Sequence, residues 1–319
     1  MRILLKPENI NKIKKLLFGS KLSDGLLLAA LIYLLLICVG FVFLLPILKI
    51  ISSSLKPLNE ILDPTVGFIP KSLYFENYKR AFQVLNLKSN LPKSVVTALL
   101  PAVCQTFMTM VTGYGFARFE FPGKKILFIL MMAVFLIPPQ VTMIPQFLTM
   151  KSYGLLSTIW SMVIPAFFAQ GLKAPLFVLI FYQFFKLIPG SLEEAAEIDG
   201  ASIYRVFFTV AIPMAVPSII VAFIFSLVWY WNETTLTALF LQAPGFENAV
   251  TFTTLPLELK NFSSAYEMMF PDGSLSVSRI SEGISMAGMV ITILPMLIIY
   301  FVLQRWFVEG VDRSGITGE

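Results

Sequence analysis

The sequence predicts an all-α integral membrane protein with six transmembrane helices, and three observations lead to this fold class. Of the 319 residues, 57% are hydrophobic and 13% are charged, and the mean hydropathy is +0.80. A soluble domain carries about 25% charged residues. The apolar residues gather in stretches that are long enough to cross a bilayer, for which a helix needs about 20 residues. The basic residues are spread along the flanks of these stretches, which is where they set the orientation of a membrane protein.

The composition also excludes several classes of function. The chain contains no histidine, which removes histidine-based catalytic triads, imidazole metal sites and histidine proton relays. It contains no P-loop sequence for binding nucleotide phosphates. The pI of 9.1 does not indicate nucleic-acid binding, because the cations follow the spans and form no cluster. Cys38 and Cys104 each lie inside an apolar run and are expected to be packing residues.

Six apolar stretches are expected to span the membrane, at 25–48, 94–117, 125–147, 155–186, 213–240 and 284–305. The first is too long for a cleaved signal peptide and no small-residue cleavage site follows it, so we expect it to be retained. The fourth is too long for one straight helix, and Pro165, Gly171 and Pro175 interrupt it. Broken helices survive at membrane depth where the freed backbone faces protein or a wet cavity. The break is therefore either part of a pathway or a structural feature without that role, namely two short half-spans or an ordinary proline kink.

Basic residues in the short loops predict that both termini are cytoplasmic. They occur in the amino tail, after the second span at Arg118, Lys124 and Lys125, and after the sixth span at Arg305 and Arg313. The resulting segments are a cytoplasmic tail (1–24), a six-helix membrane domain (25–310) with outer loops at 49–93 and 241–283 and an inner loop at 187–212, and a cytoplasmic tail (311–319).

The inner loop contains the acidic segment SLEEAAEIDGASIYRVFFTVAIP, residues 191–213. Ser191 and Glu194 have the spacing of a capping box, which predicts a helix start. Gly200 is expected to end that helix, and a second short helix is expected from Ala201 to Val210. Pro213 then marks entry to the next span. An amphipathic helix resting on headgroups is the alternative, but such helices favour Lys and Arg on their polar face. The carboxylates therefore favour docking to a protein partner.

The same segment resembles the EAA motif of binding-protein-dependent ABC importer permeases, written EAA-x3-G-x9-I-x-L-P. Glu194-Ala195-Ala196, Gly200 and Val210-Ala211-Ile212-Pro213 match it in register, with Val for Ile and Ile for Leu. Together with Trp231-Asn232-Glu233 and the glycines from Gly310 to Gly318, the motif looks like the carbohydrate-uptake group, in particular its maltose-type second permease subunit. The resemblance covers roughly 25–310. The residues to which it assigns coupling to an ATPase are Glu193, Glu194, Ala195, Ala196, Glu197, Asp199, Gly200, Ala201 and Pro213.

This resemblance implies a type I ABC importer permease, with a cytoplasmic coupling helix between helices four and five. It implies a location in the bacterial cytoplasmic membrane, a second permease subunit, which is usually a different chain, and an extracytoplasmic solute-binding protein. A separate cytoplasmic ATPase dimer would use ATP and Mg, and this chain would bind no cofactor. The long outer loop at 241–283 departs from the family pattern, which leaves docking geometry there open.

Polar and aromatic residues within the spans are candidates for the substrate pathway, because polar groups at membrane depth are costly and mark function. A sugar has hydroxyl rims and apolar ring faces, so aromatic plates beside amides or carboxylates suit it. The candidates are Gln140, Gln170, Lys173, Trp229, Trp231, Asn232 and Glu233. The aromatic residues are alternatively part of an interfacial belt, and Glu233 alternatively forms a structural ion pair with Lys173.

Three functions remain in order of preference. The first is a permease subunit that forms half of an alternating-access pathway for a carbohydrate, a di- or oligosaccharide. The second is the same role for a glycerol phosphodiester or polyol. The third is an ion-coupled secondary transporter, which needs buried acidic relays or a visible internal repeat; the sequence offers Glu233 and Lys173 alone as candidates.

Overall fold

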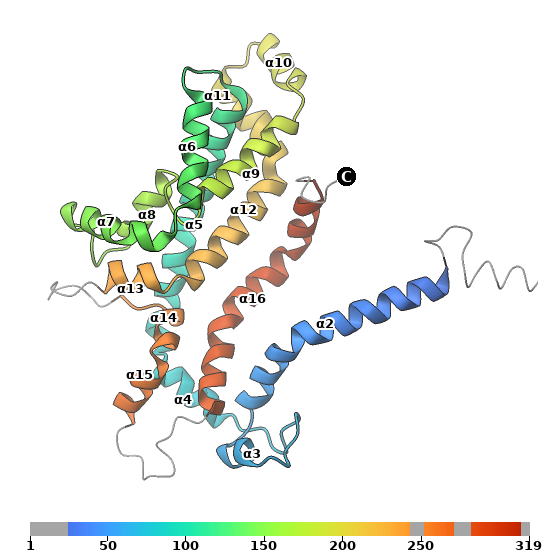
Figure 1. The fold of residues 1–319 in the computed structure, drawn as a ribbon, viewed down its shortest axis with the longest axis vertical. Helices are drawn as coiled ribbons and strands as arrows, with labels where there is room; N and C mark the ends of the chain where they lie inside the picture. Colours follow the sequence, from blue (N-terminus) through green and yellow to red (C-terminus); the bar gives the residue numbers. More distant parts are fainter. Residues whose placement is uncertain (1–24, 243–251, 271–281, 314–319) are drawn as a thin grey trace, which may run out of the picture. The chain divides into compact units, whose positions relative to one another are not determined.

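The computed structural model describes residues 25–242, 252–270 and 282–313, and the regular structure of these residues is helical with no strand (Figure 1). The chain divides into two compact units, 1–77 with 281–287, and 78–280 with 288–319. The helices are α2 (Leu26–Ser54), α3 (Leu58–Leu62), α4 (Glu76–Val84), α5 (Leu87–Arg118), α6 (Lys124–Leu136), α7 (Pro139–Ser152), α8 (Trp160–Phe167), α9 (Ala174–Leu187), α10 (Ser191–Ile198), α11 (Ile203–Val206), the π-helix η1 (Phe207–Ala211), α12 (Ile212–Asn232), α13 (Thr235–Leu241), α14 (Leu255–Lys260), α15 (Phe262–Met269) and α16 (Glu282–Arg313).

The all-α membrane fold class is confirmed. In the part of the chain that the structure describes, four helical segments are long and apolar enough to cross a membrane: α2, α5, 203–232 and 282–306. Two bent helix pairs, α6 with α7 and α9 with α10, raise the number to six if each pair counts as one span. The six-span prediction agrees with that upper number.

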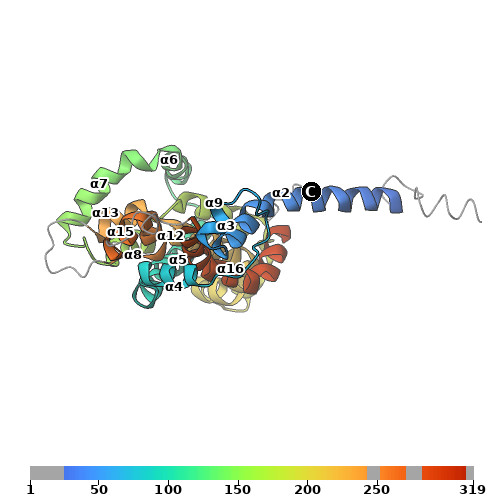
Figure 2. The ribbon, with the colours of Figure 1, turned by 90° about the horizontal axis from the view of Figure 1, so that it is seen from below.

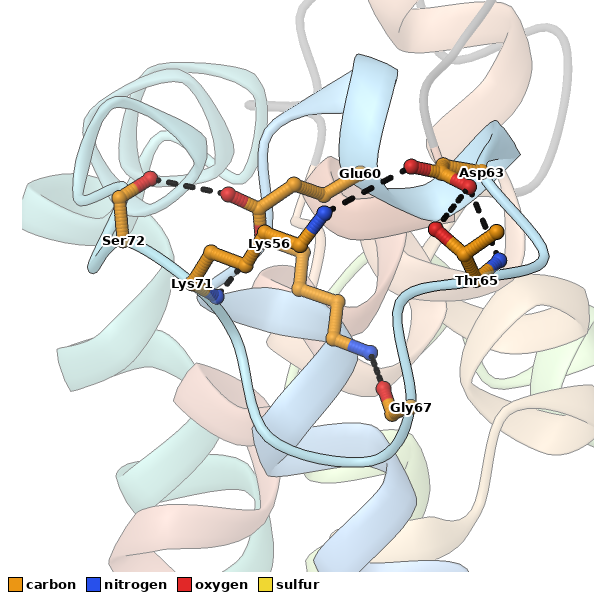
Figure 3. A network of polar contacts seen from close by, with 7 residues as sticks. All are labelled: Lys56, Glu60, Asp63, Thr65, Gly67, Lys71 and Ser72. Carbon is orange, nitrogen blue, oxygen red and sulfur yellow. Dashed lines mark hydrogen bonds and ion pairs between the residues drawn. The ribbon is translucent and has the colours of Figure 1, made fainter.

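In the first unit, two buried charges organise the segment after α2 (Figure 3). Lys56 and Glu60 are each 8% exposed. The Lys56 ammonium donates to the Gly67 carbonyl at 2.6 Å, and the Glu60 carboxylate accepts from the Lys71 N–H at 3.0 Å and the Ser72 hydroxyl at 3.1 Å. Because a buried charge is costly unless it is hydrogen-bonded, these bonds define the course of the loop from residue 63 to 72.

The start of this loop, at residues 63–65, is also held by hydrogen bonds, but these are exposed to solvent. Asp63 accepts hydrogen bonds from the hydroxyl and the N–H of Thr65, at 2.7 and 2.9 Å. These bonds, with a smaller contribution from Lys71, hold the pKa of the Asp63 carboxyl below its usual value. The loop is therefore held both by the buried Lys56 and Glu60 and by the exposed bonds of Asp63.

In the second unit, α5, α9 and α12 pack side by side and form the core (Figures 1 and 2). Most of the buried residues are alanine or aromatic, and the set is Met110, Tyr114, Phe177, Phe181, Phe185, Ile188, Phe207, Ala211, Ala215 and Ala222. Gly113 sets the closest approach, because a Cβ added there would lie 2.6 Å from the Phe181 Cβ and 3.0 Å from the Tyr182 backbone nitrogen. Absence of a side chain at Gly113 thus lets α5 and α9 touch.

The predicted third span, 125–147, is not one helix. It consists of α6 and α7, which meet at an angle of 103° (Figure 2). Ile137 precedes Pro138 and has an extended conformation, with ψ 125°. Proline disfavours the helical conformation of the preceding residue, so the Pro138-Pro139 pair ends one helix and begins another.

The predicted second short helix, 201–210, is continuous with the fifth span. Residues 203–232 form a single helical segment, which passes through the π-helix η1 before Pro213. Proline has no N–H for the carbonyl four residues earlier, and the wider π-helical turn absorbs that missing bond. Pro213 lies in the first turn of α12, as predicted, although the helical segment that contains it already begins at residue 203.

Both predicted outer loops contain helical structure. Residues 49–93 include the end of α2, α3, α4 and the first turns of α5. Within 241–283, the structure describes residues 241–242, 252–270 and 282–283. In this part of the chain, α14 packs against α5, and the Leu255 N–H donates to the Ser94 hydroxyl at 2.7 Å. Hydropathy identifies the lipid-facing length of a helix but not its polar extensions. The tail predicted at 1–24 lies outside the described residues, and α16 continues through 311–313.

We expect Gly113→Ala to lower the thermal unfolding midpoint of the detergent-solubilised protein. The added methyl overlaps Phe181, and overpacking of this kind costs about 1–3 kcal/mol. Gly115→Ala is the matched control, since a Cβ there meets nothing within 4 Å and alanine favours the helix. Equal midpoints for the two variants would contradict the close α5–α9 contact.

Candidate functional site

The predicted break in the fourth span is present between α8, which ends at Phe167, and α9, which begins at Ala174. Two buried side chains, Gln105 of α5 and Tyr230 of α12, bind its backbone, and a third, Ser226, binds Gln105. The Gln105 side-chain amide donates to the Leu172 carbonyl at 2.9 Å and to the Ser226 hydroxyl at 3.1 Å. The Tyr230 hydroxyl donates to the Gln105 Oε1 at 2.9 Å and accepts from the Leu172 N–H at 3.2 Å. We call Gln105, Ser226 and Tyr230 the break clasp.

The break clasp leaves room for glycine alone at residue 171. A Cβ on Gly171 would overlap the Gln105 Oε1 and the Tyr230 hydroxyl. Gln105 is fully buried and Tyr230 is 3% exposed, so neither side chain has free space to move into. The sequence identified Gly171 as an interruption of the span, but not as the space in which the clasp sits.

Lys173 directly follows Leu172, the residue that the break clasp binds, and has a left-handed backbone, with φ 52°. Its ammonium lies 5.3 Å from the centroid of the Trp229 ring, a distance typical of a cation–π contact. Trp229 in turn packs against Phe177, with ring centroids 5.3 Å apart. The structure thus brings together two of the predicted pathway residues, Lys173 and Trp229.

Beside this pair lies a groove of about 340 Å³ between α9 and α12. Its lining is mostly apolar and consists of Leu176, Phe177, Leu179, Ile180, Gln183, Phe225 and Trp229. We call it the α9–α12 groove. Gln183 is its polar side chain, and no signal in the sequence distinguishes this glutamine from the others.

The other predicted pathway residues lie elsewhere. Trp231 is 4% exposed and belongs to the interior of the chain. The Asn232 side-chain amide donates to the Val228 carbonyl of its own helix at 2.9 Å. The Glu233 carboxylate accepts from two backbone N–H groups at the start of α13, those of Thr235 at 2.7 Å and Leu236 at 2.8 Å. Glu233 therefore caps a helix and is not the ion-pair partner of Lys173.

The two glutamines named with them have exposed side chains. Gln140 is in the first turn of α7, beyond the bend at Pro138. Gln170 is inside the break, where its backbone N–H donates to the Pro165 carbonyl at 2.8 Å. Among the described residues, neither side chain forms a hydrogen bond with Lys173 or Trp229.

The acidic segment after α9 begins with α10, at a 72° bend from α9. The expected capping box is not formed: Ser191 is already the first helical residue, and Gly190 precedes it with no side-chain cap. The carbonyl of Gly190 instead accepts from the N–H groups of Glu193 and Glu194, both at 3.0 Å. The two carboxylates lie in the first turn, where they complement the positive end of the helix dipole.

Gly200 ends α10 as predicted, and its φ of 83° explains why a glycine is needed. Its N–H donates to the Glu197 carbonyl at 2.9 Å, and the Ala201 N–H donates to the Ala196 carbonyl at 3.0 Å. This pair of bonds is a Schellman motif. It turns the chain sharply into α11, so the two short helices are joined with a defined geometry.

An ion pair fixes the base of α10. The Arg118 Nε lies 3.0 Å from the Glu193 Oε1, and the two side chains are 16% and 12% exposed. A second Arg118 nitrogen donates to the Ile188 carbonyl at 3.0 Å. The sequence identified Arg118 only as an orientation signal and Glu193 as a contact for a partner. In the structure the two anchor α10 to α5, and Glu193 is turned inward.

Most of the other residues of α10 and α11 are exposed, although Val206 at the end of α11 is buried. Glu194, Glu197 and Asp199 are exposed, and beside them Ile198 is 86% and Tyr204 is 80% exposed. Carboxylates around protruding apolar side chains do not suit a headgroup surface, which favours Lys and Arg. They suit the groove of a protein partner.

A helical bundle with spans interrupted by prolines and a short, anchored helix pair between two of them defines a multi-pass membrane protein. Residues 106–313 match the family described as the binding-protein-dependent transport system inner membrane component. The chain belongs to this family.

Named relatives and a solved structure agree with that assignment. The chain is 30% identical to the diacetylchitobiose uptake system permease protein NgcG of Streptomyces coelicolor, over 90% of this chain and 88% of the relative. It is also 30% identical to the trehalose transport system permease protein SugB of Mycobacterium tuberculosis, over 86% and 93%. A bacterial ABC transporter involved in the import of the acidic polysaccharide alginate has the same fold in one chain, with a TM-score of 0.68, 22% identity, and coverage of 88% of this chain and 96% of that one.

We expect Tyr230→Phe to destabilise the protein by about 1–3 kcal/mol, because it leaves the buried Gln105 Oε1 and the Leu172 N–H without their partner. The measurement is the thermal unfolding midpoint in detergent. Tyr153→Phe is the matched control, since Tyr153 is 73% exposed. An unchanged midpoint for Tyr230→Phe would show that the break clasp does not hold the break.

Proposed function

We propose that this chain is a transmembrane permease subunit of an ATP-driven, solute-binding-protein-dependent importer, and that it forms half of an alternating-access pathway for a di- or oligosaccharide. The observation that carries the proposal is the docking element: α10 is anchored to α5 by Arg118, ended by the Schellman motif at Gly200, and exposed on its outer face. The names of the relatives, a diacetylchitobiose and a trehalose system, support a carbohydrate substrate.

In this role α10 is the coupling helix, seated in a cleft of a cytoplasmic ATPase. A dimer of that ATPase binds ATP and Mg, and this chain binds no cofactor. A second permease subunit completes the pathway, and a solute-binding protein delivers substrate from outside. This places the protein in the bacterial cytoplasmic membrane with both termini in the cytoplasm. The contact residues are the exposed ones, with Glu193 as the internal anchor.

The described structure favours neither alternative function. Glu233, which an ion-coupled mechanism would use as a buried acidic relay, serves as the cap of α13. A polyol or glycerol phosphodiester importer would share the same fold and coupling, and the two relatives named above, a diacetylchitobiose and a trehalose system, favour a carbohydrate.

Uptake of a labelled oligosaccharide panel into proteoliposomes tests the function. We expect transport by the assembled complex to require ATP inside and the binding protein outside, and the purified chain alone to hydrolyse no ATP. ATP hydrolysis by this chain, or carbohydrate uptake driven by an ion gradient without the ATPase, would contradict the proposal.

A graded series at Gly200 tests the coupling role. A Cβ at this position meets nothing within 4 Å, so any effect comes from backbone strain at φ 83°. Asparagine tolerates this conformation and β-branched residues do not, so we expect Gly200→Asn to retain most uptake and Gly200→Val to lose it while the protein remains in the membrane. Gly190→Ala is the control, with φ −60°. Full transport by Gly200→Val would argue against coupling through this turn.

A further inference from the structure

Lys173 holds its charge at a depth where a cation is costly. The 14 residues of α9 separate it from Leu187, which is about 20 Å at the rise of an α-helix. The hydrocarbon core is about 30 Å thick, and α9 ends beside the polar α10 segment. Lys173 therefore lies well inside the membrane. Cations at this depth face a protein interior or a water-filled cavity and pair with a partner.

Within the described residues, the partner of the Lys173 ammonium is the Trp229 ring, and no carboxylate lies within ion-pair distance of it. Glu233 caps α13. The side chain is exposed and is held in place from behind, because the break clasp binds both the N–H and the carbonyl of Leu172. Lys173 is thus a positioned cation with one face toward an aromatic ring and the rest of its charge uncompensated.

The α9–α12 groove continues from this pair along one side of α9. Leu176, Ile180 and Gln183 line it, and they are spaced at helical intervals of three and four residues. From Lys173 to Gln183 the helix rises about 15 Å, a length that suits an oligosaccharide better than a single sugar. The apolar side chains and the Trp229 ring offer flat surfaces for the C–H faces of sugar rings. The groove has a cation near one end and an amide toward the other.

We propose that Lys173 and Trp229 form a subsite for an acidic sugar, in which the ring of a uronate residue stacks on Trp229 and its carboxylate pairs with the Lys173 ammonium. The charge of Lys173 and the absence of a carboxylate beside it in the described chain favour an anionic ligand, and the adjacent aromatic plate favours a sugar ring over a bare anion. The substrate class is then a uronate-containing oligosaccharide. This inference rests on the proposed importer function and adds its specificity.

The test is equilibrium binding to the assembled permease–ATPase complex, without the binding protein, followed by tryptophan fluorescence. The probes are trigalacturonate and trimannuronate, each as the free acid and as the methyl ester. We expect at least one acid to bind about tenfold or more tighter than its ester, as a charge-assisted hydrogen bond provides. Lys173→Met should abolish that difference and leave the affinity of the ester unchanged.

Lys186→Met is the matched control. Lys186 is on the same helix and its ammonium lies over the Tyr182 ring at 5.1 Å, but it is at the other end of α9, so the preference for the acid should persist. Equal affinities of acid and ester in the wild-type complex would overturn the subsite. So would an equal loss of both in Lys173→Met, which is the result expected if Lys173 pairs with a carboxylate of the partner permease.

ATP-dependent uptake restricted to neutral sugars would reject the acidic substrate and keep the importer, whereas no ATP-dependent uptake of any carbohydrate would reject the proposed function itself.

Discussion

The arrangement of the second unit depends on how one interrupted helix is satisfied. In a bilayer each unpaired backbone group costs several kcal/mol, so the break between α8 and α9 needs internal partners. Gln105 of α5 and Tyr230 of α12 supply them, and each of the two side chains also binds the other. Three helices are thereby fixed at one point, and Lys173 has its orientation as a result.

At the opposite end of α9, an unpaired backbone carbonyl is bound by a charged side chain and not by neutral ones. The carbonyl of Ile188 is left open where α9 ends, and Arg118 of α5 binds it while pairing with Glu193 of α10. A charged side chain is suited to this end of α9 because the Arg118 side chain is 16% exposed and stays near water. The break clasp is buried, and its side chains are neutral. The acidic segment is therefore part of the fold as well as the surface proposed for docking to a partner.

Composition and pattern were enough to predict the all-helical membrane class, the interruption of the fourth span and the turn at Gly200. They were not enough for features that depend on contacts between distant residues. Nothing in the local sequence distinguishes Glu193 from Glu194, yet only the first faces Arg118. Glu233 and Trp231 have the residue types of a sugar site, and packing assigned one to a helix cap and the other to the interior. The 103° bend was readable in principle from Pro138-Pro139, but hydropathy alone runs straight through it.

Side chains of α5 bind the backbone carbonyls that flank α9 on both sides, Leu172 through Gln105 and Ile188 through Arg118. A helix clamped at two points about 20 Å apart cannot slide or rotate against its neighbour. The pair therefore moves as one rigid strut, and in the proposed coupling role a displacement of α10 is transmitted through it to the region of Lys173. The sliding surfaces of a transport cycle then lie at the borders of this strut and not inside it.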